Sequence, residues 1–243
     1  PRKMAPGQYS ADPKRHTLQP IVTGATVVGM KYAGGVLLAA DTMASYGSQA
    51  RYKDVCRLKK VGNYTLLGAS GEISDFQYIG DLLDELDMTD FLQEDGCHMG
   101  PQEYASYIGR VMYNRRSKMN PLYNQLIVAG KKESGESHLA FIDHQGTAFQ
   151  EEFIATGFGA YLAMPILRNE WKPDISLEDA KKLAIKCLQV CFYRDCNAYF
   201  KIHVATCDGE TQEISEPIAM DHYWGHSAWL KKSLEGGTLG VNE

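Results

Sequence analysis

The sequence lacks the long apolar segments that mark membrane and secreted proteins. None of its apolar runs approaches the roughly 20 residues that a membrane-spanning helix needs. The basic N-terminal stretch is not followed by the apolar core of a secretory signal. The formal net charge of -5 also argues against a dedicated binder of nucleic acid or of anionic membranes. We therefore expect a chain that binds neither nucleic acid nor a membrane.

Metal-binding patterns are also missing. The six cysteines include no CxxC pair, and a zinc site would need further Cys or His ligands at close spacing. Cys187 and Cys191 are four residues apart on one face of an expected helix, and we interpret them as free thiols of a reducing cytosol or nucleus. His222 and His226 have the same spacing, but the glutamate of an HExxH motif is absent. No metal site is expected.

Phosphate-binding loops are absent as well. GASGE (residues 68–72) and ATGFGA (residues 155–160) are rich in glycine, but neither fits GxxxxGK[ST] or GxGxxG. Both are typical of tight turns into helices, whose backbone N–H groups can line a cleft. The basic cluster Arg115, Arg116 and Lys118 is expected at a helix C-terminus, where cations offset exposed carbonyls. These patterns predict no cofactor.

What the sequence does contain is the composition of one globular domain. The 243 residues are 44% hydrophobic and 23% charged, without an internal repeat or a low-complexity segment. Apolar periodicity predicts alternating blocks of strands and helices. Strands are expected at residues 26–33, 36–40, 57–61, 64–69, 126–129, 139–143, 148–153, 202–205 and 212–214. Helices are expected from residue 74, from residue 101, and at residues 160–169, 176–193 and 221–235.

Some element boundaries carry specific signals. Ser74 with Gln77 resembles a capping box, Pro101 is well placed in a first helical turn, and Ser176 fits an N-cap. The run VLLAA, at residues 36–40, is apolar at every position, which predicts a strand covered on both faces. Blocks of strands and helices favour an α+β fold with two packed antiparallel sheets between helices.

Two aspartates follow expected elements. Asp41 ends a buried strand and Asp195 ends a helix, so they could form a carboxylate pair for acid–base chemistry. An isolated aspartate at such a place more often caps the element. The residues alone leave both interpretations open.

Four ordered motifs resemble one family. They are GATVVGMKYAGGVLLAAD, GASGEISDFQYI, ATGFGAYLA and CFYRDC, and together they resemble the β-type subunits of the proteasome from about residue 22 to residue 199. PIVTGATV, DTMASYGSQARY and MYNRRSKMNPLYN (residues 112–124) narrow the resemblance to one non-catalytic member. It implies a four-layer αββα sandwich of the N-terminal nucleophile hydrolase type. It also implies a lead segment at residues 1–24, the sandwich at 25–220, and a C-terminal helix and tail at 221–243.

The resemblance implies a degenerate catalytic site. Active members carry a threonine after a glycine, freed by self-cleavage, whose hydroxyl attacks and whose amine acts as base. Here the threonine position holds an alanine that has residues in front of it, and the lysine position holds an arginine, which cannot exchange protons. A serine of the glycine-rich turn is replaced by phenylalanine, and a second serine by alanine. The six family positions fall on Ala25, Asp41, Arg57, Phe158, Asp195 and Ala198.

The leading hypothesis is therefore a structural subunit with no catalytic residue and no cofactor. The resemblance implies partners among proteasome α and β subunits in a 28-subunit barrel, a C-terminal tail that reaches the opposite β ring, and a place in the cytoplasm and nucleus. The alternative is a self-processing threonine peptidase that uses Thr26, although this residue follows an alanine and faces the other side of its strand. A third hypothesis is a free-standing binding protein.

Overall fold

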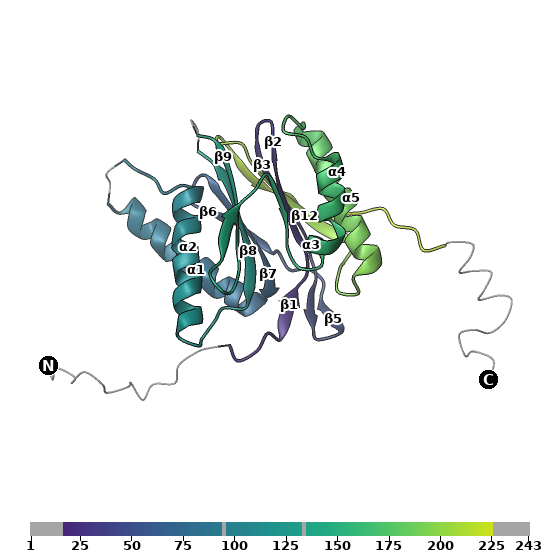
Figure 1. The fold of residues 1–243 in the computed structure, drawn as a ribbon, viewed down its shortest axis with the longest axis horizontal. Helices are drawn as coiled ribbons and strands as arrows, with labels where there is room; N and C mark the ends of the chain where they lie inside the picture. Colours follow the sequence, from purple (N-terminus) through teal and green to yellow (C-terminus); the bar gives the residue numbers. More distant parts are fainter. Residues whose placement is uncertain (1–16, 94–95, 133–134, 226–243) are drawn as a thin grey trace.

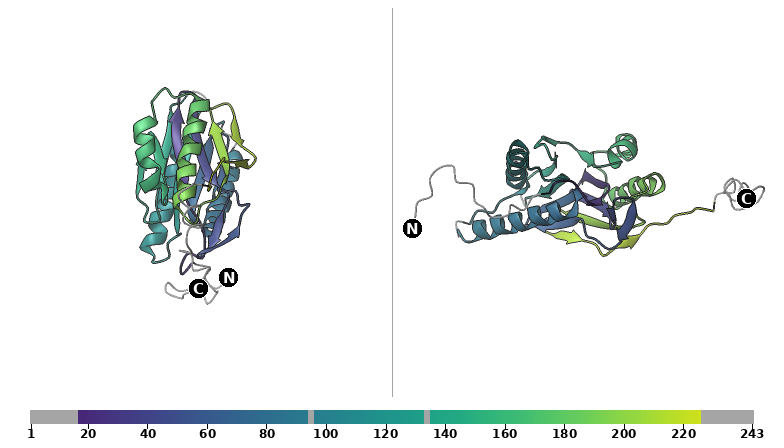
Figure 2. Two further views of the ribbon diagram at one scale, coloured as in Figure 1. Left: turned by 90° about the vertical axis from the view of Figure 1, so that its right-hand side faces the viewer. Right: turned by 90° about the horizontal axis from the view of Figure 1, so that it is seen from below.

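The computed structural model describes residues 17–93, 96–132 and 135–225. Two antiparallel sheets pack face to face, and helices cover the outer face of each (Figure 1). The four layers are also distinct when the molecule is seen from below (Figure 2). The α+β sandwich that the sequence predicts is confirmed.

The larger sheet has eight strands among the described residues. They are β1 (Val22–Gly24), β4 (Ala44–Tyr46), β5 (Gln49–Tyr52), β6 (Leu58–Val61), β7 (Thr65–Glu72), β8 (Asn124–Lys131), β9 (Ser137–Ile142) and β10 (Ala148–Gln150). Seven of them lie in the order β10-β9-β8-β7-β1-β4-β5, and β6 pairs with β7. The first strand of the described residues is thus an interior strand of this sheet.

The smaller sheet has six strands in the same described ranges. They are β2 (Val27–Tyr32), β3 (Gly35–Asp41), β11 (Phe153–Ala155), β12 (Lys201–Cys207), β13 (Gln212–Ile214) and β14 (Ile218–Ala219). The order is β11-β2-β3-β12-β13, and β14 pairs with β12. Every residue of β3 is buried, so the prediction that VLLAA is covered on both faces is confirmed.

Helices flank both sheets. The larger sheet is covered by α1 (Ile73–Phe91) and α2 (Pro101–Ser117). The smaller sheet is covered by α3 (Gly159–Leu162), α4 (Met164–Glu170) and α5 (Leu177–Arg194). No helix in the described ranges is long and apolar enough to cross a membrane.

The hydrophobic core is divided by the layers into three clusters. One lies between α1, α2 and the larger sheet, and another lies between α5 and the smaller sheet. The third joins the two sheets, with Leu38 of β3 and Ile127 of β8 both fully buried. A sheet whose two faces are both covered needs apolar side chains at successive positions, which explains the unbroken apolar runs of the sequence.

Three expected elements differ from the sequence prediction. The capping box of Ser74 and Gln77 is wrong, because α1 begins at Ile73 and the Ser74 hydroxyl donates to Glu72. The expected strand at residues 148–153 is two strands, since β10 pairs with β9 and β11 crosses to pair with β2. The expected helix at residues 160–169 is interrupted at Ala163, because Pro165 has no N–H to continue the first helix.

Other boundaries are confirmed. Pro101 opens α2, and the Ser176 hydroxyl caps α5 by accepting from the Asp179 backbone N–H at 3.2 Å. Arg115 and Arg116 lie in the last turn of α2, as expected for cations at a helix C-terminus. Of the expected C-terminal helix at residues 221–235, residues 221–225 are irregular and the rest, His226 included, lies outside the described residues.

Candidate functional site

The residue in the expected nucleophile position joins the two sheets. Ala25 follows β1 directly and precedes β2 by one residue, so the chain passes there from the larger sheet into the smaller one. On its N-terminal side Gly24 pairs with Ala44 of β4 and with Gly71 of β7. The backbone in front of Ala25 is therefore an integral strand.

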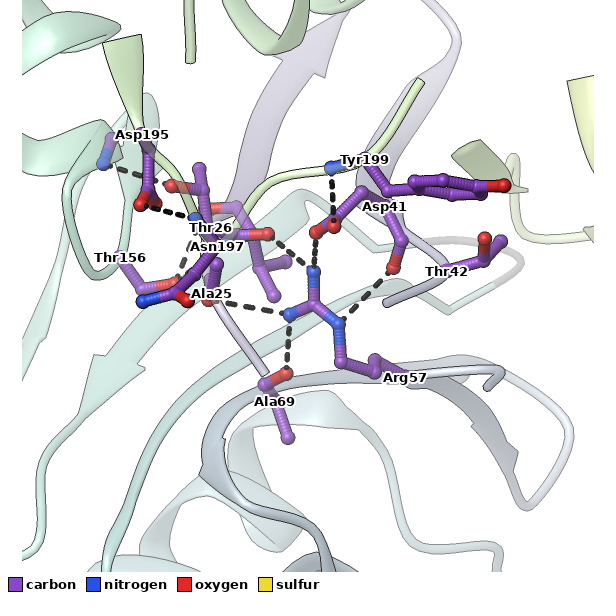
Figure 3. Close-up of polar contacts among 12 residues, drawn as sticks. Ala25, Thr26, Asp41, Thr42, Arg57, Ala69, Thr156, Asp195, Asn197 and Tyr199 are labelled. Atoms are coloured by element: carbon purple, nitrogen blue, oxygen red, sulfur yellow. Dashed lines mark hydrogen bonds and ion pairs between the residues drawn. The ribbon is translucent and has the colours of Figure 1, made fainter. Parts of the chain in front are cut away.

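Arg57 is the centre of the site. Its side chain is fully buried (0% exposed), and it reaches the carbonyls around the junction of the two sheets (Figure 3). Nε donates to the Asp41 carbonyl at 3.1 Å and Nη2 donates to the Thr26 carbonyl at 2.9 Å. Nη1 donates to the carbonyls of Ala25, at 3.3 Å, and of Ala69, at 3.0 Å.

The fifth N–H of the guanidinium faces a carboxylate. Nη2 of Arg57 forms a hydrogen-bonded ion pair with Oδ1 of Asp41. A guanidinium has five N–H donors, so every donor of Arg57 is used. Asp41 and Arg57, two of the six family positions, thus form a buried ion pair, and the guanidinium cross-links the connection between β1 and β2 to β3 and β7.

Asp41 is held from a second side. Its Oδ2 accepts from the Tyr199 backbone N–H at 3.0 Å (Figure 3). Burial raises the pKa of the Asp41 carboxyl, while the Arg57 guanidinium and the backbone N–H groups of Tyr199 and Met43 oppose that rise. The Asp41 carboxylate therefore contacts the Arg57 guanidinium and the Tyr199 backbone.

Thr26, the alternative nucleophile, is placed unfavourably for attack. Its side chain is 1% exposed, and its hydroxyl oxygen accepts from the Gly159 backbone N–H at 2.9 Å. Its carbonyl accepts from Arg57. The hydroxyl thus serves to fix the start of α3 beneath β2.

The remaining family positions surround this junction. Phe158, at the start of α3, is 58% exposed. Asp195 is the C-cap residue of α5, and its Oδ1 accepts from the Asn197 backbone N–H at 2.9 Å. The Ala198 backbone N–H donates to the Asp195 carbonyl at 3.1 Å. Asp195 therefore shapes a turn and does not pair with Asp41, so the interpretation as a cap is the one that the structure favours.

Sequence reasoning missed two features of the site. Gly24 is required by Arg57, because a Cβ at Gly24 would lie 2.3 Å from Arg57 Cδ. Glu72, buried at 4% exposure, accepts from the backbone N–H groups of Ile21 and Val22 at 2.5 and 3.0 Å. Neither contact has a local signal, since each joins residues more than 30 positions apart.

The sequence is similar to known proteins over most of its length. The sequence profile described as "Proteasome subunit" matches residues 21–207. Proteasome subunit beta type-4 of Arabidopsis thaliana is 47% identical, over 91% of this chain and 90% of the relative. Proteasome subunit beta type-4 of Xenopus laevis is 43% identical, over 92% of this chain and 94% of the relative. Proteasome subunit beta type-7 of Saccharomyces cerevisiae is 39% identical, over 83% of this chain and 79% of the relative.

The names of these relatives, beta type-4 and beta type-7, are those of the non-catalytic member to which PIVTGATV, DTMASYGSQARY and residues 112–124 together narrowed the resemblance. The identity extends over most of each chain and includes both sheets. The chain therefore belongs to the proteasome subunit family, among its β-type subunits.

Proposed function

We propose that this chain is a non-catalytic, structural β subunit of the 20S proteasome core. The observation that supports this role most directly is the side chain of residue 25. Ala25 has a methyl group where the active members have a hydroxyl, so it has no oxygen to attack a carbonyl.

The missing amine supports the same role. The α-amine that would act as base is held in the Gly24–Ala25 peptide bond, and Gly24 is paired on both sides within the larger sheet. The expected lysine is an arginine whose donors are all engaged. Thr26 is a poor substitute, because its amide is internal and its buried hydroxyl is bonded to Gly159.

The proposed work of the subunit is assembly. It would take one position in each seven-membered β ring of a 28-subunit barrel, help to enclose the proteolytic chamber, and contact α and β subunits on its outer faces. Its C-terminal tail would contact the opposite β ring. The proposed location is the cytoplasm and nucleus, and no cofactor is required.

Native gel electrophoresis of the endogenous protein, followed by mass spectrometry of the band, tests this role. We expect the chain to migrate in a large particle together with proteasome α and β subunits. A monomer of the chain's own mass would contradict the proposal and would favour the free-standing binding protein.

A further inference from the structure

Helix α2 ends in a turn that favours glycine but contains a methionine. Met119 has a φ of 53° and is the one residue other than glycine with a positive φ in the described ranges. Its backbone N–H donates to the Arg116 carbonyl at 3.1 Å, and the Asn120 backbone N–H donates to the Arg115 carbonyl at 3.0 Å. These two bonds form a Schellman motif, in which the residue with positive φ is usually glycine. A larger side chain at this position raises the energy of the folded backbone.

Contacts within the chain do not offset this cost. Met119 is 91% exposed, so its side chain buries almost no apolar area against the rest of the structure. Burial of an exposed apolar side chain against a partner would be favourable. An apolar side chain that is both strained and exposed therefore indicates a contact outside the folded chain.

Unpaired cations and an aromatic ring lie beside Met119 at the end of α2. Arg116 and Lys118 are exposed, and neither forms an ion pair with another described residue. The Arg116 guanidinium lies 5.7 Å from the centroid of the Tyr113 ring, which is about half exposed. Stacking on a ring leaves the N–H donors at the guanidinium edge available to a carboxylate. We call Tyr113, Arg116, Lys118 and Met119 the methionine patch.

We infer that the methionine patch docks on a neighbouring subunit of the particle, at an apolar socket rimmed by carboxylates. This inference rests on the proposed function. Met119 fills the socket, while Arg116 and Lys118 pair with its rim. Tyrosine, methionine and arginine are all enriched in protein interfaces. The helix dipole accounts for cations at the end of α2, but it does not account for an exposed methionine in place of glycine.

Zero-length cross-linking of purified native particles tests the acidic rim. A carbodiimide forms an amide between a lysine amine and a carboxylate in direct contact with it, and mass spectrometry of the peptides identifies both residues. We expect Lys118 to be linked to an Asp or Glu of another subunit. Lys186 is the positive control, because it pairs with Glu170 of its own chain and should be linked to it. Linkage of Lys186 without any linkage of Lys118 to another subunit would contradict the inference.

Met119→Gly separates the strain from the docking. Glycine relieves the backbone at this position, so the full chain should unfold at a temperature about 2–4 °C higher. The same variant should enter particles at least about threefold less often than the wild-type chain when both are expressed together in equal amounts. Mass spectrometry of the purified particles counts the two forms. Met119→Leu, which keeps an apolar side chain and the strain, is the matched control and should enter within about twofold of wild type.

The outcomes distinguish docking from a structural role and from failure of the proposed function. Entry of Met119→Gly at the wild-type level would overturn the inference. Lower entry together with a lower unfolding temperature would also overturn it, because Met119 would then stabilise the chain itself. Particles that contain the chain without a Lys118 cross-link refute the docking and leave the proposed function intact. Absence of the wild-type chain from particles would refute both.

Discussion

At the residue scale, Arg57 accounts for most of the site. A buried guanidinium is stable only when its donors and its charge are both satisfied, and here four backbone carbonyls and the Asp41 carboxylate do so. The same contacts leave Arg57 no donor for a substrate. The arrangement therefore stabilises the junction between the sheets and is unsuited to proton transfer.

Removing the guanidinium should destabilise the protein strongly. We expect Arg57→Met to lower the free energy of unfolding by about 3–5 kcal/mol, because Asp41 and the carbonyls remain buried without their donor. The matched control is Lys59→Met, since Lys59 forms a partly exposed ion pair with Asp84, and its loss should cost about 1 kcal/mol or less. Urea unfolding of the full chains measures both. Equal effects of the two variants would contradict the role given to Arg57.

Gly24 should be intolerant of even one methyl group. Gly24→Ala is expected to cost about 1–3 kcal/mol, because the added Cβ overlaps the Arg57 side chain. Gly109→Ala, in the middle of α2, adds a Cβ whose nearest neighbour is the Ala148 Cβ at 3.9 Å, and it should be neutral or stabilise by up to about 1 kcal/mol. Thermal or urea unfolding that ranks the two variants the other way would refute this explanation of Gly24.

At the element scale, α5 combines a polar start with a buried thiol face. Ser176 caps its N-terminus, and Cys187 and Cys191 pack against the smaller sheet. Burial raises the pKa of the Cys187 thiol to about 12 and that of Cys191 to about 11. Both thiols therefore remain protonated at neutral pH.

Cys56 and Cys196 are exposed and should react with a thiolate-selective reagent in the native chain, whereas the buried Cys187 and Cys191 should not. Labelling with iodoacetamide at pH 8, followed by peptide mass spectrometry, measures the difference. In urea all four should react. Native labelling of Cys187 at the rate of Cys56 would show that α5 is not packed as described.

The cap of α5 should depend on pH. Hydrogen bonds from Ser176 and Lys182 lower the pKa of Asp179, so its contribution to stability is complete above its unfolded pKa near 4 and is lost as the pH falls through the lower folded value. Ser176→Ala should cost about 1 kcal/mol at pH 7 through the lost cap. Its cost should be smaller at pH 2.5, as measured by urea unfolding at both values. A cost that rises toward acid pH would contradict this assignment.

Some of the strands and helix boundaries could be predicted from the sequence, and others could not. The apolar runs of β3 and β7 and the cap of α5 were predictable, because period and capping are local signals. Strand β1 was not, since three residues carry no alternation and its pairing depends on strands that follow later. The capping box at Ser74 failed because tertiary contacts use Glu72 for the lead segment. Family resemblance identified Asp41 and Arg57 as site positions, but it could not show that Arg57 excludes a side chain at Gly24.

At the scale of the whole molecule, we expect neighbouring proteasome subunits to contact the helices that cover the two sheets. The C-terminal tail is the most specific of the expected contacts. Deleting residues 236–243 should leave the chain folded but slow the joining of half-particles, because a tethered arm acts through effective concentration once one contact has formed. Pulse-chase analysis on native gels measures the joining rate. Joining at the wild-type rate would contradict the role proposed for the tail.

Restoring the missing hydroxyl should not restore activity. Ala25→Thr supplies an oxygen, but the amine remains held in the Gly24–Ala25 peptide bond. Arg57 also remains bonded to the carbonyls of residues 25 and 26. Particles that contain this variant should show no additional labelled subunit with an epoxyketone probe. An adduct on residue 25 would show that the hydroxyl alone was missing.

The central claim is that this chain is a proteasome subunit without catalytic chemistry, and intact-mass analysis of the chain from purified native particles tests it most directly. Particles are first treated with an epoxyketone probe, and the subunits are then separated and weighed. We predict an unmodified chain in which the Gly24–Ala25 bond is uncut, next to catalytic subunits that carry the probe. A chain that begins at Ala25 or Thr26, or that carries the probe, would contradict the account.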